Sequence, residues 1–381
     1  MVFHFPPISG GGVVVAAGIA NSFAELGNEV TVITPDVDWV GERYEPKIHS
    51  SVKIVKVKTP SRSNLKIAAR RCKENVKKKG IELGRSEKFD FIFSIFHPFH
   101  LVPRAAVSCG KELDIPVIIK IDDAVYEKSS GLKSIQRKIE KIYNSKTLQN
   151  ATRILVSNQD TKHTVSTYYK VPRDKISVVP NGIELSHFYT KNVSSKRIIF
   201  SGVMYYHRGI DVLLNALPKI AKNVPDMELF LLGVGPEMQK LKDIVDKKNL
   251  SRNVVFKGWV NREEIPQYLS ESAIGVGPLR ATTVTKNALP IKVLEYMASS
   301  LPIVAMEDTL PTNVLQNEYN GYFVKNVDEL ADKVIFLLEN EKTRRDMGRN
   351  SRDLVAKFDW KNVIKLILDE YQKCKTSSSL E

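Results

Sequence analysis

Short apolar runs alternate with longer amphipathic stretches along the whole chain. The runs are rich in β-branched residues and are bounded by polar or turn residues, which predicts buried strands. In the first half these strands are 30–34, 91–95, 117–121, 153–157 and 176–179, with a short further strand at the N-terminus. In the second half they are 198–201, 228–232, 254–256, 274–276 and 303–305. The helices predicted between them include 14–26, 105–113, 212–221 and 237–247. This alternation predicts an α/β fold with parallel sheets and helices on both faces.

The alternation restarts after Pro180-Asn181-Gly182, which places a joint in the middle of the chain. A length of 381 residues exceeds what one core usually holds. We therefore predict two successive α/β domains, 1–180 and 181–357. Open α/β sheets bind ligands beyond the carboxyl ends of their strands, so two facing sheets would hold a ligand in a cleft between them.

Composition narrows the class of protein. With 43% apolar and 26% charged residues the chain is not disordered or fibrous. No run approaches the ~18 apolar residues of a membrane span, and the first residues do not have the pattern of a signal peptide. The three cysteines, Cys72, Cys109 and Cys374, are too far apart in sequence to suggest a disulfide framework or a thiolate metal site. We expect a cytoplasmic protein.

The net charge of +14 is concentrated in the first half. The stretch from Lys53 to Lys88 holds 13 basic residues and only three acidic ones. Such a surplus favours an anionic partner: a phosphorylated ligand, anionic lipid or nucleic acid. An ordinary solvated basic face is the alternative. Nucleic acid is not expected, because the stretch lacks the interleaved aromatic residues on which bases stack.

Three segments carry residues suited to a phosphorylated ligand. Gly10, Gly11 and Gly12 precede a predicted helix, where glycine allows close backbone approach and helix N–H groups attract phosphate; a simple tight turn is the alternative. Arg208 lies in a strand-to-helix loop, 201–211, from which it could bind a phosphate with two hydrogen bonds.

The third segment is 287–298, a predicted helix that begins near Pro290, with Asn287 close to a capping position. Lys292 and Glu295 are three residues apart and so share one face near its N-terminus. A helix N-terminus, a lysine and a carboxylate one turn further on could hold a phosphorylated ligand that carries hydroxyl groups. The alternative is an ordinary Glu–Lys surface pair.

Polar residues also follow two predicted strands of the first domain. His97 and His100 follow the strand at 91–95, and Asp122 and Asp123 follow the strand at 117–121. The two histidines lack a third ligand at a suitable spacing, so no metal site is predicted. For the aspartates we expect hydrogen bonding or acid–base work rather than Mg²⁺ binding.

Taken in order, these pieces resemble the retaining GT-B glycosyltransferases of the group 1, family-four type. The resemblance runs over nearly the whole chain and rests on ordered landmarks. They are Pro7–Gly11, Leu26–Thr34, Val156-Ser157, Lys175–Ile183, Leu232–Pro236, Asn253–Gly258 and Asn320–Val324. The segment 358–375 resembles the helix that crosses back onto the first domain in this family.

The resemblance implies roles for individual residues. Arg208 takes the place of a lysine that contacts the donor diphosphate, and Glu295 that of the second glutamate of the EX7E motif, which binds the donor ribose. The backbone of Ala288, Leu289, Pro290 and Ile291 would face the diphosphate and the sugar, and the loop after Gly258 would hold the base.

Three positions depart from the family pattern. Asn287 replaces the first glutamate of EX7E, Val203 replaces an arginine, and Asp122 stands where a histidine is frequent. Arg208 is thereby left as the main side-chain cation of the 201–211 loop. Asp122 becomes the most plausible carboxylate on the acceptor or sugar side.

The resemblance implies that the chain moves a hexose from a UDP- or GDP-sugar to an acceptor hydroxyl with retention of configuration and without a metal or other cofactor. We assign catalytic roles to Arg208, Asp122 and Glu295. We assign donor binding to Arg208, Lys292 and Glu295, together with Asn287, the segment 288–291 and the glycines at 10–12. An epimerase that acts on nucleotide sugars in the same fold, and a basic nucleic-acid-binding protein, remain as alternatives.

The acceptor is the remaining partner, and the basic first domain suggests its class. Leu65, Ala69, Cys72 and Val76 recur at helical spacing, and lysines and arginines fill the other faces of the predicted helix. A basic amphipathic helix can rest on an anionic membrane surface. We therefore expect a glycan or lipid-linked acceptor at the cytoplasmic face of a membrane, with the Lys53–Lys88 region in contact with the lipid.

Overall fold

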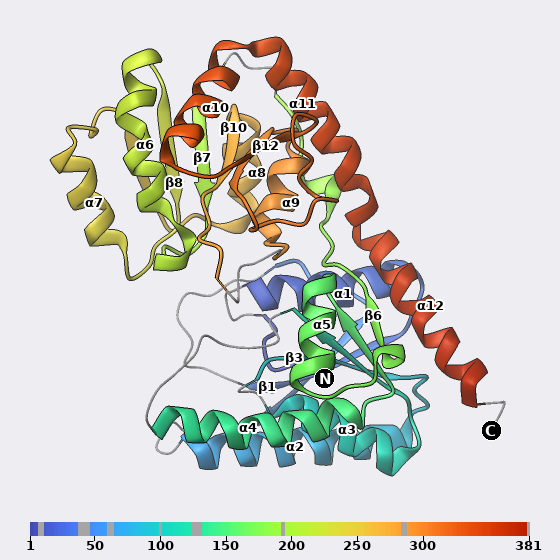
Figure 1. The fold of residues 1–381 in the computed structure, drawn as a ribbon. Helices are drawn as coiled ribbons and strands as arrows, with labels where there is room; N and C mark the ends of the chain where they lie inside the picture. The colour runs from blue at the N-terminus through green and yellow to red at the C-terminus, as the bar shows by residue number, and fades with distance from the viewer. Residues whose placement is uncertain are drawn as a thin grey trace. The chain divides into compact units, whose positions relative to one another are not determined.

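The computed structural model describes residues 1–6, 11–36, 46–58, 65–98, 101–122, 132–191, 195–282 and 288–378. The chain forms two compact units: unit 1 comprises Met1–Gly182 and Trp360–Glu381, and unit 2 comprises Ile183–Asp359 (Figure 1). The boundaries expected from the sequence lie within three residues of these. Each unit is described below by itself.

Unit 1 contains a parallel sheet in the order β3-β4-β5-β6 and a parallel pair, β1-β2. Their bounds are β1 Val30–Asp36, β2 Val52–Lys58, β3 Ile92–Phe96, β4 Val117–Ile121, β5 Arg153–Val156 and β6 Ile176–Val178. The expected N-terminal strand is absent from residues 1–6, although the segment is bonded on both sides. Val2 N donates to Ile33 O (3.1 Å), and Ser94 Oγ donates to Met1 O (2.8 Å). These are scattered bonds, one of them from a side chain, and not a continuous ladder.

The helices of unit 1 are α1 Gly11–Glu25, α2 Leu65–Ser86, α3 Val102–Leu113, α4 Leu132–Gln149, α5 Gln159–Tyr168 and α12 Trp360–Ser378, with a 3₁₀ turn at Arg173–Lys175. Local chemistry sets several of their ends. Pro103 occupies the first turn of α3, and Asp114 ends that helix in the left-handed conformation (φ 55°). The side chain of Asn158 caps α5 by accepting from Thr161 N.

Helix α2 corrects the expectation that its apolar face is free to meet a membrane. Cys72, Val76 and Leu83 are buried and pack against Ile33 of β1 and Val57 of β2. From Cys72 onward, the apolar face of this amphipathic helix therefore belongs to the core of unit 1. The side chains of Leu65 and Ala69, the other two members of the expected stripe, lie outside the described part of the structure.

The C-terminal helix α12 returns to unit 1, as the family resemblance implied. Its first residue, Trp360, packs so closely on Gly18 and Gly182 that a Cβ on either glycine would lie 2.4 Å from the indole. Further along, Glu370 accepts from Arg153 Nε (2.7 Å) and Ser177 Oγ (2.5 Å), so the helix is tied to β5 and β6.

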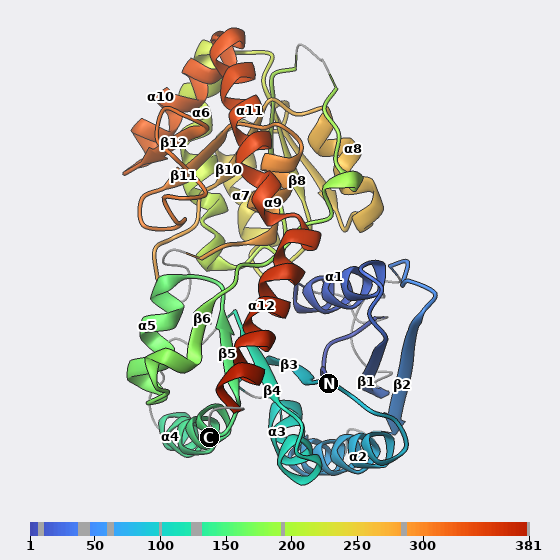
Figure 2. The same cartoon turned by 90° about the vertical axis from the view of Figure 1, so that its right-hand side faces the viewer.

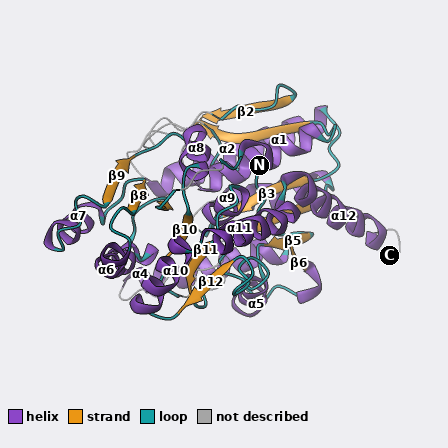
Figure 3. Cartoon of the chain, turned by 90° about the horizontal axis from the view of Figure 1, so that it is seen from above, coloured by secondary structure: helices purple, strands orange, loops and turns teal. Residues whose placement is uncertain are grey.

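Unit 2 contains one parallel sheet in the order β12-β11-β10-β7-β8-β9, and Figure 3 shows most of these strands following one another across the unit. Their bounds are β7 Arg197–Ser201, β8 Glu228–Leu232, β9 Val254–Gly258, β10 Ile274–Gly277, β11 Ile303–Met306 and β12 Gly321–Val324. If β7 is counted as strand 1 and the sheet is read from β9 to β12, the order is 3-2-1-4-5-6. This is the strand order of a doubly wound nucleotide-binding sheet.

Helices cover both faces of this sheet. They are α6 Ile210–Asn223, α7 Met238–Lys247, α8 Ile265–Ser270, α9 Ile291–Ala298, α10 Val327–Glu339 and α11 Glu341–Val355, with 3₁₀ turns at Leu185–His187, Tyr206–Arg208, Arg262–Glu264 and Ala356–Phe358. Alternate residues of β7 enter two separate cores: Ile198 and Phe200 pack in one, and Ile199 in the other. Burial on both faces explains why these strands read as continuous apolar runs.

Candidate functional site

The strand order of unit 2 reverses direction between β7 and β10, so the carboxyl ends of these strands form the switch point where ligands of such sheets bind. The loop after β7 and the loop after β10 meet there. Gly209 has φ 66°, and a Cβ on it would lie 1.8 Å from Pro278 O. Only glycine fits this position, on both steric and conformational grounds.

Arg280 joins the two loops. Its guanidinium donates to both carboxylate oxygens of Asp211, at 2.9 and 2.6 Å, and to Tyr206 O at 2.7 Å. Burial acts to raise the pKa of Asp211, but the hydrogen bonds and charge of Arg280 outweigh it, so the pKa lies below its usual value. The switch-point loops are therefore connected by a bidentate ion pair at the start of α6.

The loop after β8 packs against the loop after β7, backbone to backbone. A Cβ on Gly233 would lie 2.3 Å from Gly202 O, and a Cβ on Gly235 would lie 2.6 Å from Met204 N. The glycines of the Leu232–Pro236 landmark thus permit this contact. They hold Gly202, which has φ 128°, at the carboxyl end of β7.

Lys292 is the least usual residue of the site. It lies in the first turn of α9 and is only 9% exposed, and its Nζ has no hydrogen-bond partner within the described part of the chain. This Nζ lies 3.7 Å from the ring centroid of Phe200 and would be 3.1 Å from a Cβ on Gly202. Burial, and then the positive charge of Arg208, hold its pKa well below that of an ordinary lysine, against the opposing effect of Glu295. The amino group thus lies beside the β7 loop, and no carboxylate among the described residues contacts it directly.

Glu295 is buried one turn further along α9, and its Oε1 accepts from Arg262 Nη2 at 2.6 Å. Arg262 comes from the turn that follows β9, where a capping box between Asn261 and Glu264 fixes the backbone. Lys292 and Glu295 are therefore not a surface pair. The carboxylate instead joins α9 to the loop after β9.

Tyr296, the residue after Glu295, is fully buried, and its hydroxyl accepts from Ser201 N at 2.9 Å. Burial raises its pKa. This bond attaches the end of β7 to α9, so the Gly202 loop and Lys292 keep a fixed relation. The sequence analysis did not identify this residue.

The charges at this edge of unit 2 are unbalanced. Arg208 acts electrostatically on Lys292, and Arg262 is the partner of Glu295. Besides the Arg280–Asp211 pair, three basic side chains thus accompany the carboxylate of Glu295, and the N-terminus of α9 adds the positive end of its dipole. Exposed aromatic side chains, Tyr205, Tyr206 and Trp259, lie on the loops after β7 and β9. The arrangement fits an anion with an attached ring system.

Two family models match this chain, one in each half. Residues 183–354 match the model for glycosyl transferases group 1, and residues 9–187 match the model for glycosyltransferase family 4. Together they span almost the whole chain.

The chain is a group 1 glycosyltransferase.

Individual glycosyltransferases resemble this chain in sequence, over all or part of its length, and in fold. The uncharacterized glycosyltransferase MJ1607 of Methanocaldococcus jannaschii is 25% identical, covering 98% of this chain and 97% of its own. Alpha-monoglucosyldiacylglycerol synthase of Acholeplasma laidlawii is 23% identical over 51% of this chain, and the match covers about half (55%) of that enzyme. The crystal structure of Anabaena HepE in complex with UDP has a TM-score of 0.74 at 13% identity, covering 98% and 99% of the two chains. The fold of this glycosyltransferase is GT-B.

The residues expected to bind the donor fall into two groups in this glycosyltransferase. Arg208, Lys292, Glu295 and the segment 288–291 all lie in unit 2, at the carboxyl edge of its sheet or at the start of α9. Gly11 and Gly12 are the first residues of α1 in unit 1. The expected helix at 14–26 therefore begins earlier, at the glycines. Gly10, Asn287, Asp123 and His100 lie outside the described residues.

The carboxyl ends of the strands in unit 1 carry a different set of charged groups from those in unit 2. Lys120 is fully buried on β4, and its Nζ is 2.5 Å from Asp122 Oδ1. His97 follows β3 with its ring 6.1 Å from that of His4, and burial together with His4 lowers the pKa of His97 to about 4. The described residues of this edge are therefore close to balanced in charge at physiological pH. Among the described residues no group of three or more His, Cys, Asp or Glu is placed to hold a metal ion.

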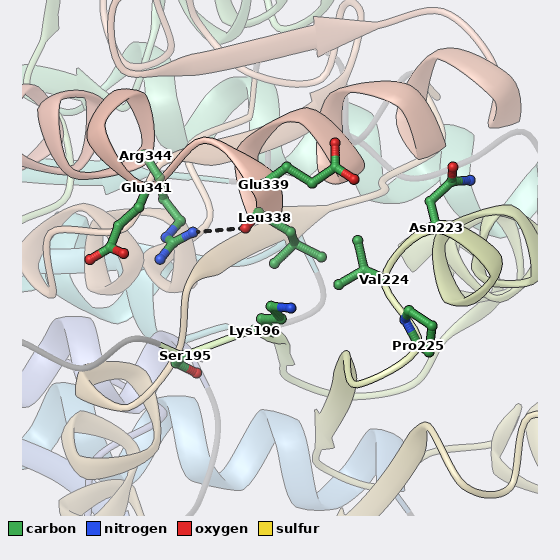
Figure 4. Close-up of a pocket in the computed structure, with 9 residues that line it drawn as sticks. All are labelled: Ser195, Lys196, Asn223, Val224, Pro225, Leu338, Glu339, Glu341 and Arg344. Atoms are coloured by element: carbon green, nitrogen blue, oxygen red, sulfur yellow. Dashed lines mark hydrogen bonds between the residues drawn. The ribbon is translucent and has the colours of Figure 1, made fainter.

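A pocket of unit 2 lies away from these loops. A pocket of about 340 Å³ is lined by residues before β7 and by the ends of α6 and α10, as Figure 4 shows. Arg344 borders it and donates to Leu337 O and Leu338 O, which closes the C-terminus of α10. Because this pocket adjoins the amino ends of the strands, it is not part of the switch-point site.

Proposed function

We propose that this glycosyltransferase transfers a hexose from a nucleoside-diphosphate sugar to an acceptor hydroxyl, with retention of configuration. The observation that carries the proposal is the buried, unpaired Nζ of Lys292 beside Arg208 and the N-terminus of α9. A diphosphate is an anion whose two phosphates could contact both cations and the helix N–H groups at once. The crystal structure of HepE with UDP, which shares the fold, supports this class of ligand.

The proposed chemistry follows from where negative charge develops. The acceptor oxygen forms a bond to the anomeric carbon on the face from which the diphosphate leaves, and an oxygen of the leaving phosphate takes the acceptor proton. Arg208 and Lys292 stabilise the departing diphosphate. Glu295 binds the ribose through the carboxylate oxygen not held by Arg262, and Asp122 of unit 1 binds the acceptor. The protein's cations thus neutralise the leaving group, and we expect no requirement for an added metal.

The test is a transfer assay with UDP-, GDP- and ADP-hexoses and simple glycoside or glycolipid acceptors, each with EDTA and with Mg²⁺. We expect one nucleotide class to be used, equal rates with EDTA and Mg²⁺, and a product whose anomeric proton has the donor's configuration. A product with the opposite anomeric configuration to the donor, or transfer that occurs only when Mg²⁺ is present, would contradict the mechanism.

Competition between ligands separates the roles of Lys292 and Glu295. Pyrophosphate shares the phosphates of UDP or GDP and lacks the ribose. Lys292→Met should therefore weaken inhibition by pyrophosphate and by the nucleoside diphosphate to the same degree. Glu295→Gln should weaken only the nucleoside diphosphate. If Glu295→Gln affects both equally, Glu295 acts on the phosphate site and not on the ribose.

A further inference from the structure

An exposed apolar stripe runs along α4 in unit 1. Ile135, Ile139, Ile142 and Tyr143 are 58%, 51%, 67% and 55% exposed, and their spacing places them on one side of the helix. These four side chains lie within nine residues, whereas the other exposed large apolar side chains of the described chain are spread over many elements. A stripe of this kind is unusual on a surface that faces only water.

The opposite side of α4 makes its contacts with the rest of the unit. Leu148 packs in the core with β4 and β5, and Asn144 accepts from Arg104 Nη2 (3.0 Å) and donates to Pro98 O (3.1 Å). The stripe therefore points away from the sheet. It is not an inward face left incompletely packed.

Positive charge surrounds the stripe. Helix α4 carries five lysines and arginines against the single acid Glu140. Lys138 lies on the flank of the stripe and is exposed, and Lys146 is exposed near its C-terminal end. Lys141, on another side of α4, lies with its Nζ 4.0 Å from the ring centroid of Tyr168 in α5.

The neighbouring helices extend the same face. Figures 1 and 2 show α4, α3 and α2 side by side along one side of unit 1. Because α2 buries Cys72 and Val76 against the sheet, its charged side also points away from it. That helix contributes eight lysines and arginines against two glutamates. The layer thus combines one apolar stripe with a broad basic surface.

We propose that α4 docks unit 1 on an anionic membrane surface, with the isoleucine stripe inserted among the lipids and the basic residues of α4 and α2 at the headgroups. Apolar insertion and attraction to anionic lipid are the two contributions that hold interfacial helices on bilayers. A second copy of this chain is disfavoured as the occupant, because a symmetric contact would bring two positively charged helices together. The site differs from the one expected in the sequence, where the apolar residues of α2 were to meet the lipid.

The test is co-sedimentation with vesicles made of phosphatidylcholine alone or of equal parts phosphatidylcholine and phosphatidylglycerol, at low and high salt and without donor. We expect binding to the anionic vesicles only, weakened by salt. Ile139→Ser with Ile142→Ser should reduce the partition coefficient roughly tenfold or more. The control is Ile54→Ser with Leu366→Ser, which removes two exposed apolar side chains (41% and 42%) from β2 and α12 and should leave binding unchanged.

Three outcomes would overturn the proposal. The first is absence of binding to anionic vesicles. The second is equal binding of the α4 variant and the wild type, with loss only on Arg70→Glu and Lys78→Glu in α2, which would reduce the effect to surface charge. The third is a concentration-dependent dimer in sedimentation velocity that the α4 variant abolishes. Because no donor is present, these outcomes are independent of whether the transferase proposal holds.

Discussion

The carboxyl edges of the two sheets differ in charge. At the edge in unit 2, the basic side chains of Arg208, Lys292 and Arg262 accompany the carboxylate of Glu295, alongside the Arg280–Asp211 ion pair. At the edge in unit 1, Lys120 is matched by Asp122, and burial favours the neutral form of His97. Among the described residues, basic groups therefore outnumber carboxylates at the first edge and balance them at the second. On this difference rests our proposal that unit 2 binds the anionic donor and unit 1 the hydroxyl-bearing acceptor.

Lys292→Met should have the largest effect, because it removes a buried amino group that has no hydrogen-bond partner among the described residues. We expect affinity for the preferred nucleoside diphosphate to fall roughly 100-fold. Folding stability should rise by about 1 to 2 kcal/mol, because a methionine of similar length replaces a buried ammonium without a hydrogen bond. Calorimetry and urea unfolding measure the two quantities. Lys219→Met, at an exposed ion pair of α6, is the control and should change neither by much.

Asp122→Asn tests the charge balance between Lys120 and Asp122 at the carboxyl edge of the sheet in unit 1. It leaves the buried Lys120 ammonium unpaired, and we expect a loss of about 2 to 3 kcal/mol in the free energy of unfolding. Lys120→Met with Asp122→Asn should recover most of that stability, since neither charge remains. If transfer activity stays low in the stable double variant, Asp122 acts on the acceptor. Full recovery of activity would make its role structural.

Acidification should disturb unit 1. The pKa of His97 is about 4 when folded and near 6.5 when unfolded, so the unfolded chain binds more protons between these values. Stability is therefore complete above pH 6.5 and decreases as the pH falls toward 4, by about 2 kcal/mol after allowance for partial exposure. His97→Gln should show a correspondingly smaller loss across this window in urea titrations. An unchanged pH profile would mean that His97 titrates normally.

Arg280→Lys should give the smallest effect. Lysine retains the positive charge but cannot make the bidentate contact with Asp211. We therefore expect the free energy of unfolding to fall by about 1 kcal/mol and the nucleotide affinity to fall several-fold. A loss of stability without any loss of affinity would show that the switch-point loops need not be joined for binding.

Much of the fold could be predicted because its strands are buried on both faces. The apolar run of β4 predicted its bounds correctly, and Ile198–Ser201 predicted all but the first residue of β7. Strand β2 was missed because Lys53, Lys56 and Lys58 interrupt its apolar residues, as is common on an edge strand. Helix α4 also escaped prediction. Its isoleucines have helical spacing, but the sequence does not reveal that they face away from the core.

The candidate site was predicted only in part, for a physical reason. Spacing on one helix placed Lys292 and Glu295 on a common face, since the helical repeat fixes that relation. The pairing of Glu295 with Arg262 joins residues 33 positions apart, and the bond from Ser201 N to Tyr296 spans 95. Such contacts depend on the tertiary fold, which local patterns do not encode.

No helix within the described residues has the length and apolar character needed to cross a bilayer.

The central claim is that unit 2 binds a nucleoside diphosphate through Lys292. Calorimetric titration of the wild type and Lys292→Met with UDP, GDP and ADP, in EDTA, tests it most directly. We expect saturable binding of one nucleotide by the wild type and a loss of roughly 100-fold in affinity in the variant, which should be the more stable of the two. Equal affinity in both proteins, or no binding of any nucleotide to the wild type, would contradict it.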